Sequence, residues 1–395
     1  MNESRNDTRN ELSNEIPSDT RWAWAEIDLD AIRHNIAHLR TVVAPAAVWA
    51  VVKADGYGHG AVDVARAAMS AGAEGLCVAL VSEGITLRRA GIDGPILILS
   101  EQPPESASQI VEHDLTPTVY TRPFLDALVA AGPTDLPVHM KIDTGMQRVG
   151  AHPHAASALA ASIAKRAPAI RLAGVYSHLA VADDPEDEFT ARQVKRFDGA
   201  LTSIVELVGA VPLVHLANSA GALAHPSTHR SMVRVGIAIY GISPGQGVDE
   251  LSAELRPVLS LRSRVSYVKM ARAGSRISYG RIYKFERDSN VATVPIGYAD
   301  GVPRRLSTNG GEVLIGGRRR KIVGRVTMDQ IMVDCGDDEV RIGDDVVLLG
   351  SQEGPGGVQT IRAEDWADRL DTIGYEIVCG ISGRVPRFPR RSING

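Results

Sequence analysis

The sequence predicts an α/β protein: a (β/α)₈ TIM-type barrel followed by a C-terminal, mainly antiparallel β domain. Between residues 48 and 236, eight short apolar runs alternate with Ala-rich stretches that have helical spacing. The runs are continuous, which is typical of strands buried on both faces. After about residue 255 the Ala-rich stretches end, and β-rich runs separated by Gly and Asp turns begin.

The eight barrel strands are expected at runs that each precede a helix-like segment. An open doubly wound sheet is the alternative, but no G-x-G-x-x-G motif follows the first run. Helical spacing is clearest in "AVDVARAAMSAG" and "PHAASALAASIAKRA". In order, the strand runs are "VWAVVK", "GLCVAL", "PILIL", "TPTVY", "PVHMKID", "RLAGVYSH", "PLVHLAN" and "MVRVG".

The second domain is expected to contain the runs "SLRSRVSYVKM", "SNVATVPIGYA", "GEVLIGGRRRKIVGRVTMDQIMVDC" and "DDVVLLG". The basic run "GGRRRK" lies between two of these strands, and we interpret it as a solvated hairpin tip rather than a nucleic-acid patch. The polar start of the chain predicts a flexible tail. The expected divisions are a tail at 1–20, the barrel at 21–255 and the β domain at 256–395.

Composition excludes several classes of protein. The net charge of the 395 residues is −4, which gives no reason to expect a nucleic acid or an anionic membrane as partner. No stretch is long enough to span a bilayer, and the start lacks the apolar region of a secretory signal. Three widely spaced cysteines suggest neither a disulfide framework nor a metal site. A cytoplasmic protein is therefore expected.

Lys53, at the end of "VWAVVK", is the first candidate catalytic residue. Active sites of TIM barrels lie at the C-terminal ends of the strands. A lysine partly desolvated there, close to other cations, would have a lowered pKa, and its amine could attack a carbonyl carbon. The glycines that follow would let the backbone approach a ligand closely. The alternative is a strand-end lysine that reaches into solvent.

The segment "AVVKADGYGHG" resembles the cofactor-lysine motif of alanine racemases, fold-type III enzymes that use pyridoxal 5′-phosphate (PLP). The resemblance extends in order from about residue 22 to residue 389, and it implies the same barrel followed by a β domain. The other blocks that carry it are "KIDTGMQRVG", "YSHLA", "ANSAG", "VRVGIAIYG", "ISYGRIY", "PIGYADG", "GRVTMDQIMVD" and "GYEIVCGIS".

The resemblance implies a cofactor site in the barrel, with Lys53 as the Schiff-base lysine. Arg234 would donate to the pyridine nitrogen of PLP, with His178 beside it. Because arginine has only donors and keeps its charge, that nitrogen should stay unprotonated, which weakens the ring as an electron sink and suppresses transamination. "ANSAG" also fits a plain helix N-cap. The residues implied to bind the cofactor, mostly at its phosphate, are Tyr57, Asn218, Ser219, Gly236, Ile237 and Tyr375.

Tyr279 resembles the second catalytic base of the family. Racemisation needs a proton removed from one face of a planar intermediate and delivered to the other, so Lys53 and Tyr279 would act on opposite faces. An unperturbed tyrosine has a pKa near ~10, so the site must lower this value. In the family this tyrosine enters the active site from the partner subunit. The resemblance therefore implies a homodimer with shared active sites.

For the substrate, the resemblance implies that Arg148 and the backbone N–H of Met328 hold the carboxylate. Lys141 is similar to a lysine that carbon dioxide carbamylates in many members, which would turn a cation that repels Arg148 into an anion that orients it. The alternative is a plain amine paired with Asp143. Residues that resemble the entrance and its inner gate are Tyr298, Asp329 and Tyr375.

The function implied is PLP-dependent interconversion of L- and D-alanine, which supplies D-alanine for cell-wall peptidoglycan. A racemase for serine or for several amino acids is an alternative of the same class. A PLP-binding homeostasis protein is a rival of another class, but such proteins lack the β domain that "ISYG" and "TMDQIMVD" belong to. A fold-type III decarboxylase is disfavoured because those enzymes place an acidic residue, not an arginine, at the pyridine nitrogen.

Overall fold

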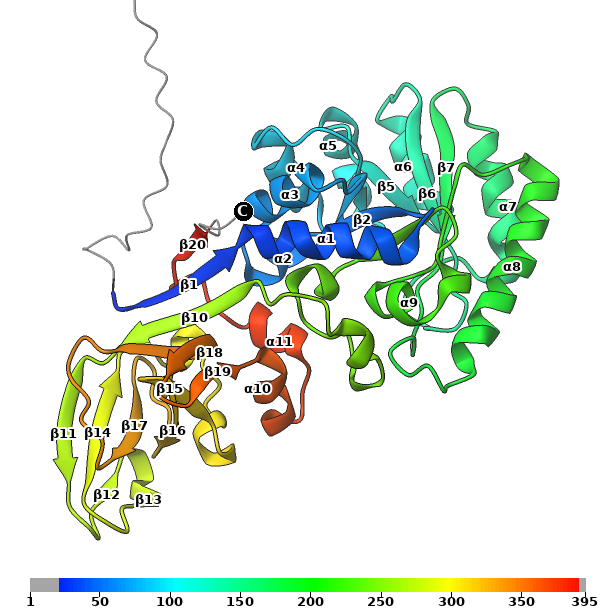
Figure 1. The fold of residues 1–395 in the computed structure, drawn as a ribbon. Coiled ribbons are helices and arrows are strands. Elements are labelled where there is room, and N and C mark those ends of the chain that lie inside the picture. Colours follow the sequence, from blue (N-terminus) through cyan, green and yellow to red (C-terminus); the bar gives the residue numbers. More distant parts are fainter. Residues whose placement is uncertain (1–20, 391–395) are drawn as a thin grey trace, which may run out of the picture.

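The computed structural model describes residues 21–390, so the flexible tail expected at residues 1–20 lies outside the described residues. Figure 1 shows a barrel with helices on its outside and, beside it, a second domain built mainly from strands. The predicted fold class is confirmed. The division of the chain between the two domains differs in one respect, which concerns the first strand.

The barrel has eight parallel strands, one at each of the eight predicted runs. Neighbours in sequence pair in space, and β9 closes the order by pairing with β2. On the other side, the Arg234 amide donates to the Ala217 carbonyl oxygen at 3.0 Å, so β8 and β9 nearly close the ring. The strands are β2 (Ala47–Val51), β3 (Gly75–Val78), β4 (Ile96–Ile98), β5 (Thr116–Val119), β6 (Leu136–Lys141), β7 (Ile170–Tyr176), β8 (Leu213–His215) and β9 (Met232–Val235).

Helices follow the strands and cover the barrel (Figure 1). The two Ala-rich stretches with helical spacing are confirmed as α3 and α7. The helices are α1 (Leu29–Val43), α3 (Ala61–Ser70), α4 (Val81–Arg89), α5 (Ala107–Glu112), α6 (Arg122–Ala130), α7 (Pro153–Ala164), α8 (Phe189–Val208) and α9 (Ser219–Ala224). A short segment, α2 (Lys53–Gly58), directly follows the first barrel strand and has unusual geometry, described below.

The second domain is organised around a ten-stranded sheet in which nearly all pairs are antiparallel. Its path runs β11-β14-β17-β16-β15-β18-β10-β1-β20, and β19 pairs with β18. The strands are β1 (Ala23–Asp28), β10 (Leu259–Arg264), β11 (Tyr267–Ala271), β14 (Ser289–Val294), β15 (Glu312–Ile315), β16 (Arg318–Val323), β17 (Ile331–Gly336), β18 (Asp345–Gly354), β19 (Gly357–Ile361) and β20 (Arg387–Arg390). Two helices, α10 (Ala363–Leu370) and α11 (Gly374–Cys379), complete the domain.

Strand β1 belongs to this second sheet, although it precedes the whole barrel in sequence. It pairs antiparallel with β10, with Trp24 opposite Arg262, and parallel with β20. Its side chains are buried on both faces, so both faces of the sheet are covered where this strand lies. The two domains are therefore not simply consecutive along the chain, and the sheet ties the N-terminal arm to the C-terminal end.

The basic run "GGRRRK" is only partly a hairpin tip. Gly316 and Gly317 form the two-residue turn with φ of +61° and +68°, values that favour glycine and the type I′ hairpin. The four basic residues lie on β16 itself, opposite β15. Arg318 and Arg320 both pair with Asp338, so neighbouring carboxylates compensate part of the charge.

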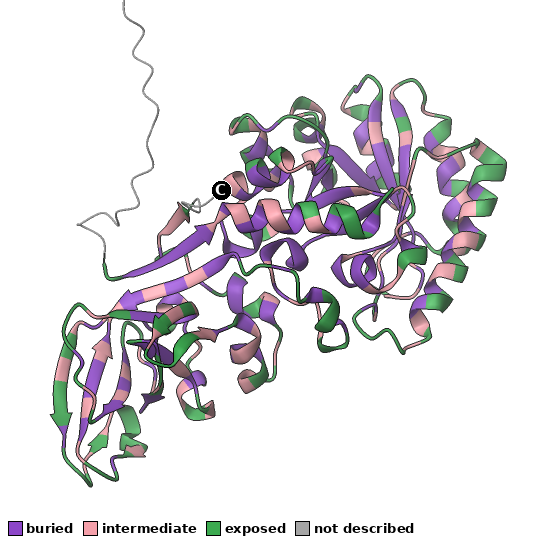
Figure 2. Ribbon diagram, in the orientation of Figure 1, coloured by how far each residue is buried: buried purple, intermediate pink, exposed green. Residues whose placement is uncertain are grey.

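Figure 2 shows buried residues concentrated in the barrel strands and in the inner strands of the second sheet. One contiguous apolar core includes residues of both domains, so the domains are packed together rather than loosely linked. Within residues 21–390, no helix is both long and apolar enough to cross a membrane.

Candidate active site

Lys53 lies immediately after β2, at the C-terminal end of the barrel strands. Its side chain is half-buried, and Nζ lies 6.0 Å from the centre of the Tyr57 ring. Burial lowers the pKa of Lys53, and the nearby Arg148 cation lowers it further. The amine is therefore more available as a nucleophile than that of a solvated lysine.

The chain leaves Lys53 through a left-handed turn. Ala54, Asp55, Gly56 and Tyr57 all have φ between +51° and +61°. Each L-residue in this conformation costs about 1–2 kcal/mol, so the turn needs compensating contacts. The Glu83 carboxylate accepts from the Ala54 amide at 2.7 Å. The Val52 carbonyl oxygen accepts from the Gly56 amide of this segment, and the Asp55 carboxylate accepts from the Ala61 amide at the start of α3.

Gly56 and Gly58 allow the turn to form and to pack against other parts of the chain. The sequence predicts that these glycines let a ligand approach the backbone. A Cβ on Gly58 would lie 2.6 Å from the Val378 carbonyl oxygen of α11, so this glycine allows two backbone segments to meet. The glycine that does face a functional side chain is Gly236, where a Cβ would lie 2.5 Å from the Tyr57 hydroxyl oxygen.

Ser219, Gly236 and Tyr57 meet at the late strand ends of the barrel. The Ser219 hydroxyl oxygen accepts from the Gly236 amide at 2.9 Å and from the Ala238 amide at 3.4 Å. With both acceptor positions used, the hydroxyl hydrogen is left to donate to an anion. Asn218 is the N-cap of α9, because its side chain accepts from the Gly221 amide at 2.9 Å, as the motif predicted.

Tyr57 and two neighbouring tyrosines form an aromatic wall beside Ser219 and Gly236. The Tyr57 ring packs against the Tyr240 ring at a centroid distance of 4.9 Å and against the Tyr375 ring at 6.0 Å. Tyr375 reaches the site from α11, so the second domain contributes to the mouth of its own barrel. Burial raises the pKa of Tyr57 and of Tyr375, which keeps both phenols neutral hydrogen-bond donors.

Arg234, on β9, is almost fully buried inside the barrel. Its Nη2 donates to the Ser177 carbonyl oxygen at 2.8 Å and lies 3.4 Å from His178 Nδ1. Its Nη1 donates to His215 Nδ1 at 2.7 Å. Across residues 21–390 Nε has no hydrogen-bond partner, so one N–H of this guanidinium remains free for a ligand.

Two histidines next to Arg234 are held neutral. Burial and the Arg234 cation place the pKa of His178 and of His215 well below the usual range. Because arginine only donates, His215 Nδ1 must accept, and its Nε2 then carries the hydrogen that faces His139 Nδ1 at 2.9 Å. This series of hydrogen bonds fixes the tautomer of His215 and the position of the Arg234 guanidinium.

Lys141 and Arg148 line a small pocket with Ser177 and His178. Burial, together with the Arg234 and Arg148 cations, lowers the pKa of Lys141 to about 7. Lys141 Nζ donates to the Leu99 carbonyl oxygen at 3.3 Å. No ion pair joins it to Asp143 in the described part of the chain, so the plain Lys141–Asp143 pair is not found.

Four expected site residues lie on the second domain and are exposed in the single chain. Tyr279 is 71% exposed and opens the turn η6 (Tyr279–Arg281) between β12 (Arg276–Ile277) and β13 (Tyr283–Lys284). Figure 1 shows β12 and β13 at the end of this domain that is remote from the barrel. Tyr298 is 42% and Met328 53% exposed, and Asp329 is exposed beside Met328.

Sequence reasoning missed Glu83, His215 and the Arg384 cluster described below. Glu83 holds the turn after Lys53 through the Ala54 amide, and nothing in "VSEGI" indicates this. His215 could have been found, because it lies within the seventh strand run, which is expected to neighbour the eighth run that contains Arg234. Within the described residues, no group of three or more His, Cys, Asp and Glu is placed to hold a metal ion.

A separate cleft of about 760 Å³ lies between α7, α8 and the loop that follows β6, and Lys53 does not line it. The reactive groups lie instead at the C-terminal ends of the barrel strands, where the poorly solvated Lys53 amine, the buried Arg234 guanidinium and the hydroxyl donors converge. An eight-stranded barrel with such a mouth, joined to a β domain, defines an enzyme that acts on a small molecule at the C-terminal face of its strands.

Comparison with known proteins identifies the family. Residues 27–244 match the model of the alanine racemase N-terminal domain, and residues 258–389 match that of the alanine racemase C-terminal domain. The alanine racemase of Symbiobacterium thermophilum is 47% identical over 93% of this chain and 97% of its own length. That of Thermobifida fusca is 44% identical over 93% and 97%.

Solved structures agree with the sequence comparison. The alanine racemase of Streptomyces lavendulae superposes with a TM-score of 0.88 at 39% identity, over 94% of this chain and 97% of that one. The Bacillus anthracis alanine racemase with bound L-Ala-P gives a TM-score of 0.87 at 39% identity, over 94% and 96%. The chain belongs to the alanine racemase family, and it is an isomerase.

Proposed function

We propose that this enzyme interconverts L- and D-alanine with PLP attached to Lys53. The observation that carries the proposal is the environment of Lys53: its amine ends a barrel strand, is half-buried, and has a pKa lowered by burial and by Arg148. Such an amine can both attach a carbonyl cofactor and exchange a proton with a substrate.

The donors in the barrel fit PLP. The free Nε–H of Arg234 matches a pyridine nitrogen, which needs one donor. The Ser219 hydroxyl hydrogen and the Ile237 amide, which has no acceptor within residues 21–390, match a phosphate, and Gly236 lies between them with its own amide bound to Ser219. When bound, the cofactor withdraws electron density from the substrate Cα and so acidifies its proton. Because Arg234 is locked by His215 and by backbone oxygens, it holds a fixed charge at the ring nitrogen without giving up a proton.

Two bases move the proton. We assign Tyr279 to the proton of L-alanine and Lys53 to that of D-alanine, on opposite faces of the substrate. Tyr279 of the same chain lies on the remote end of the second domain, so this assignment requires a second copy of the chain. The large apolar side chains exposed on the second domain support a homodimer, since a partner would cover them. Among them are Tyr279, Ile282, Tyr298 and Met328.

The substrate carboxylate is assigned to Arg148 and to the Met328 N–H of the partner copy. Lys141 is the proposed carbamylation site: its pKa of about 7 leaves a large neutral fraction, which reacts with carbon dioxide. The resulting anion would orient the Arg148 guanidinium. Tyr298, Asp329 and Tyr375 would narrow the entrance to small amino acids.

The proposed role is the supply of D-alanine for peptidoglycan, in the cytoplasm, where free cysteines such as Cys77 and Cys379 stay reduced. A preference for serine or for several amino acids would use the same residues. A PLP-binding homeostasis protein would not need the second domain, which here matches the alanine racemase C-terminal model.

The test is a chiral assay of the purified, PLP-loaded protein against a panel of L-amino acids. We expect turnover of L-alanine above that of L-serine. Lys53→Ala should abolish both turnover and the absorbance of lysine-bound cofactor, while Lys165→Ala, an exposed lysine at the end of α7, should change neither. Bound cofactor with no turnover of any amino acid would instead favour the homeostasis protein.

A further inference from the structure

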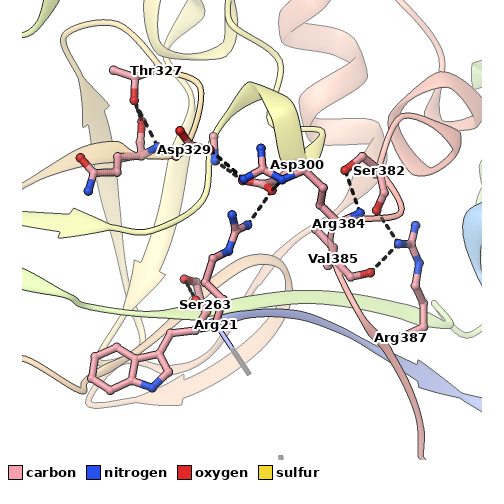
Figure 3. A network of polar contacts seen from close by, with 12 residues as sticks. Arg21, Ser263, Asp300, Thr327, Asp329, Ser382, Arg384, Val385 and Arg387 are labelled. Atoms are coloured by element: carbon pink, nitrogen blue, oxygen red, sulfur yellow. Dashed lines mark hydrogen bonds and ion pairs between the residues drawn. The ribbon is translucent and has the colours of Figure 1, made fainter. Parts of the chain in front are cut away.

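A fully buried carboxylate, Asp300, ends the turn η7 (Tyr298–Asp300). One of its oxygens, Oδ2, accepts from the Gly297 amide at 2.8 Å and so closes the turn. The other, Oδ1, lies 2.6 Å from Arg21 Nη2 and 3.5 Å from Arg384 Nε (Figure 3). These two contacts are electrostatic rather than aligned hydrogen bonds, and together they neutralise a charge that has no access to water.

Arg384 reaches a second carboxylate with the other end of its guanidinium. Its Nη2 lies 2.8 Å from Oδ1 of Asp329, which is exposed and follows Met328 directly. A planar fork with separate donors can hold two carboxylates at a fixed separation. Arg384 therefore connects the buried η7 turn to the exposed segment around Asp329, and Figure 3 shows it between Asp300 and Asp329.

The two turns joined by Arg384 are also locked back to back. The Tyr298 amide donates to the Thr327 carbonyl oxygen at 2.9 Å, and the Ala299 amide donates to the Met328 carbonyl oxygen at 3.0 Å. A Cβ on Gly297 would collide with both of those carbonyl oxygens, so the contact needs a glycine. Met328 thus has its C=O bound, whereas within residues 21–390 its N–H has no partner.

We propose that Arg384 is a positioning residue: by bridging Asp300 and Asp329 it fixes the Met328 peptide so that its free N–H can bind the substrate carboxylate in the partner subunit's active site. This rests on the proposed function, which assigns that N–H to the substrate. Arg384 itself touches no reacting atom. Its effect should be on substrate affinity, because a carboxylate contact is present equally in the bound substrate and in the transition state.

The ion pair is well suited to a test because its loss should leave the fold intact. The Arg384 and Asp329 side chains are 46% and 55% exposed, and such pairs contribute little to stability. Asp300 keeps Arg21 as its nearer partner when Arg384 is replaced. The control is Arg264→Met, which removes another half-exposed Arg–Asp pair, with Asp345, in the same sheet domain.

The experiment compares the PLP-loaded wild-type enzyme with Arg384→Met in both reaction directions. We expect KM to rise about tenfold for L- and for D-alanine, with kcat within about threefold of wild type. Propionate, which has the carboxylate but no amine, should bind about tenfold more weakly by calorimetry. Arg264→Met should change none of these values.

Two further variants distinguish positioning from a general loss of structure. Asp329→Asn should raise KM as Arg384→Met does. The KM of the double variant should be no higher than that of either single variant, because both substitutions break the same ion pair. Arg384→Lys should restore little, since an ammonium group is a single point charge.

The proposal is overturned if Arg384→Met leaves KM and propionate binding unchanged, if only kcat falls, or if the two single effects multiply in the double variant. A wild-type enzyme that racemises alanine while Arg384→Met behaves normally would refute only this inference. A wild-type enzyme inactive on alanine would refute the proposed function instead.

Discussion

Replacing Tyr279 with phenylalanine should separate catalysis from stability more sharply than any other change. The variant loses one hydroxyl oxygen from a side chain that is 71% exposed in the single chain and belongs to none of the buried apolar clusters. Surface substitutions of this kind change the free energy of unfolding by about 0.5 kcal/mol or less. The melting temperature and the bound cofactor should therefore be unchanged.

The catalytic loss should be far larger. A positioned general base contributes about 10²–10⁴-fold in rate, which corresponds to about 3–5 kcal/mol of activation free energy. Because the two enantiomers are mirror images and their equilibrium constant is one, kcat/KM must fall by the same factor in both directions. The asymmetry between the bases appears in isotope exchange instead. In heavy water, D-alanine should still exchange its α-proton through Lys53 with retained configuration, whereas L-alanine should not.

The assay is α-proton exchange by nuclear magnetic resonance together with chiral turnover in both directions. Tyr267→Phe is the matched control, because Tyr267 is 56% exposed on β11 of the same domain. Turnover within threefold of wild type in Tyr279→Phe would remove this tyrosine from the reaction. Equal exchange of both enantiomers would refute the assignment of one base to each face.

Two further predictions concern the barrel. Ser219→Ala leaves the buried Gly236 amide without its acceptor, which costs about 1–3 kcal/mol, and it removes the hydroxyl that we propose binds the PLP phosphate. Urea unfolding should detect the first effect in the cofactor-free protein, and a PLP dissociation constant raised about tenfold or more should reveal the second; unchanged PLP affinity would contradict the phosphate assignment. For Lys141, carbon dioxide adds only to the neutral amine, whose pKa is about 7, so ¹³C-labelled carbamate should be weak at pH 6 and strong at pH 8. A signal that does not rise with pH, or that persists in Lys141→Ala, would place carbamylation elsewhere.

The barrel was predictable because its signal is local. Each buried parallel strand is a short continuous apolar run, and each intervening helix is long enough to show its own period. The same reasoning could not assign β1 to one of the two sheets, because "WAWAEID" is compatible with a strand in either domain. Its partners are set by packing against Ser260 and Arg262, far along the chain.

The site was predictable only where a residue type carries its own chemistry. Lys53 stands out because an amine at a strand end is unusual, but the left-handed turn that follows includes Ala54 and Tyr57, which do not favour that conformation intrinsically. The turn exists because Glu83, nearly thirty positions away, accepts the Ala54 amide. Contacts of that kind, like Arg384 with Asp300, depend on tertiary placement and leave no periodic pattern in the sequence.

The proposed division of the two bases between subunits leads to a complementation experiment. A homodimer of Lys53→Ala chains lacks the cofactor lysine in both sites, and a homodimer of Tyr279→Phe chains lacks the phenol in both. In a heterodimer of the two, one barrel has Lys53 and faces the intact Tyr279 of its partner, while the other site has neither group. Such a heterodimer, isolated with two different affinity tags after co-expression, should recover about half of the wild-type turnover per dimer. If each chain used its own Tyr279, no combination of these chains would contain a complete site. Activity no greater than the sum of the two parent homodimers would therefore refute the shared site, even if both single variants behave as expected.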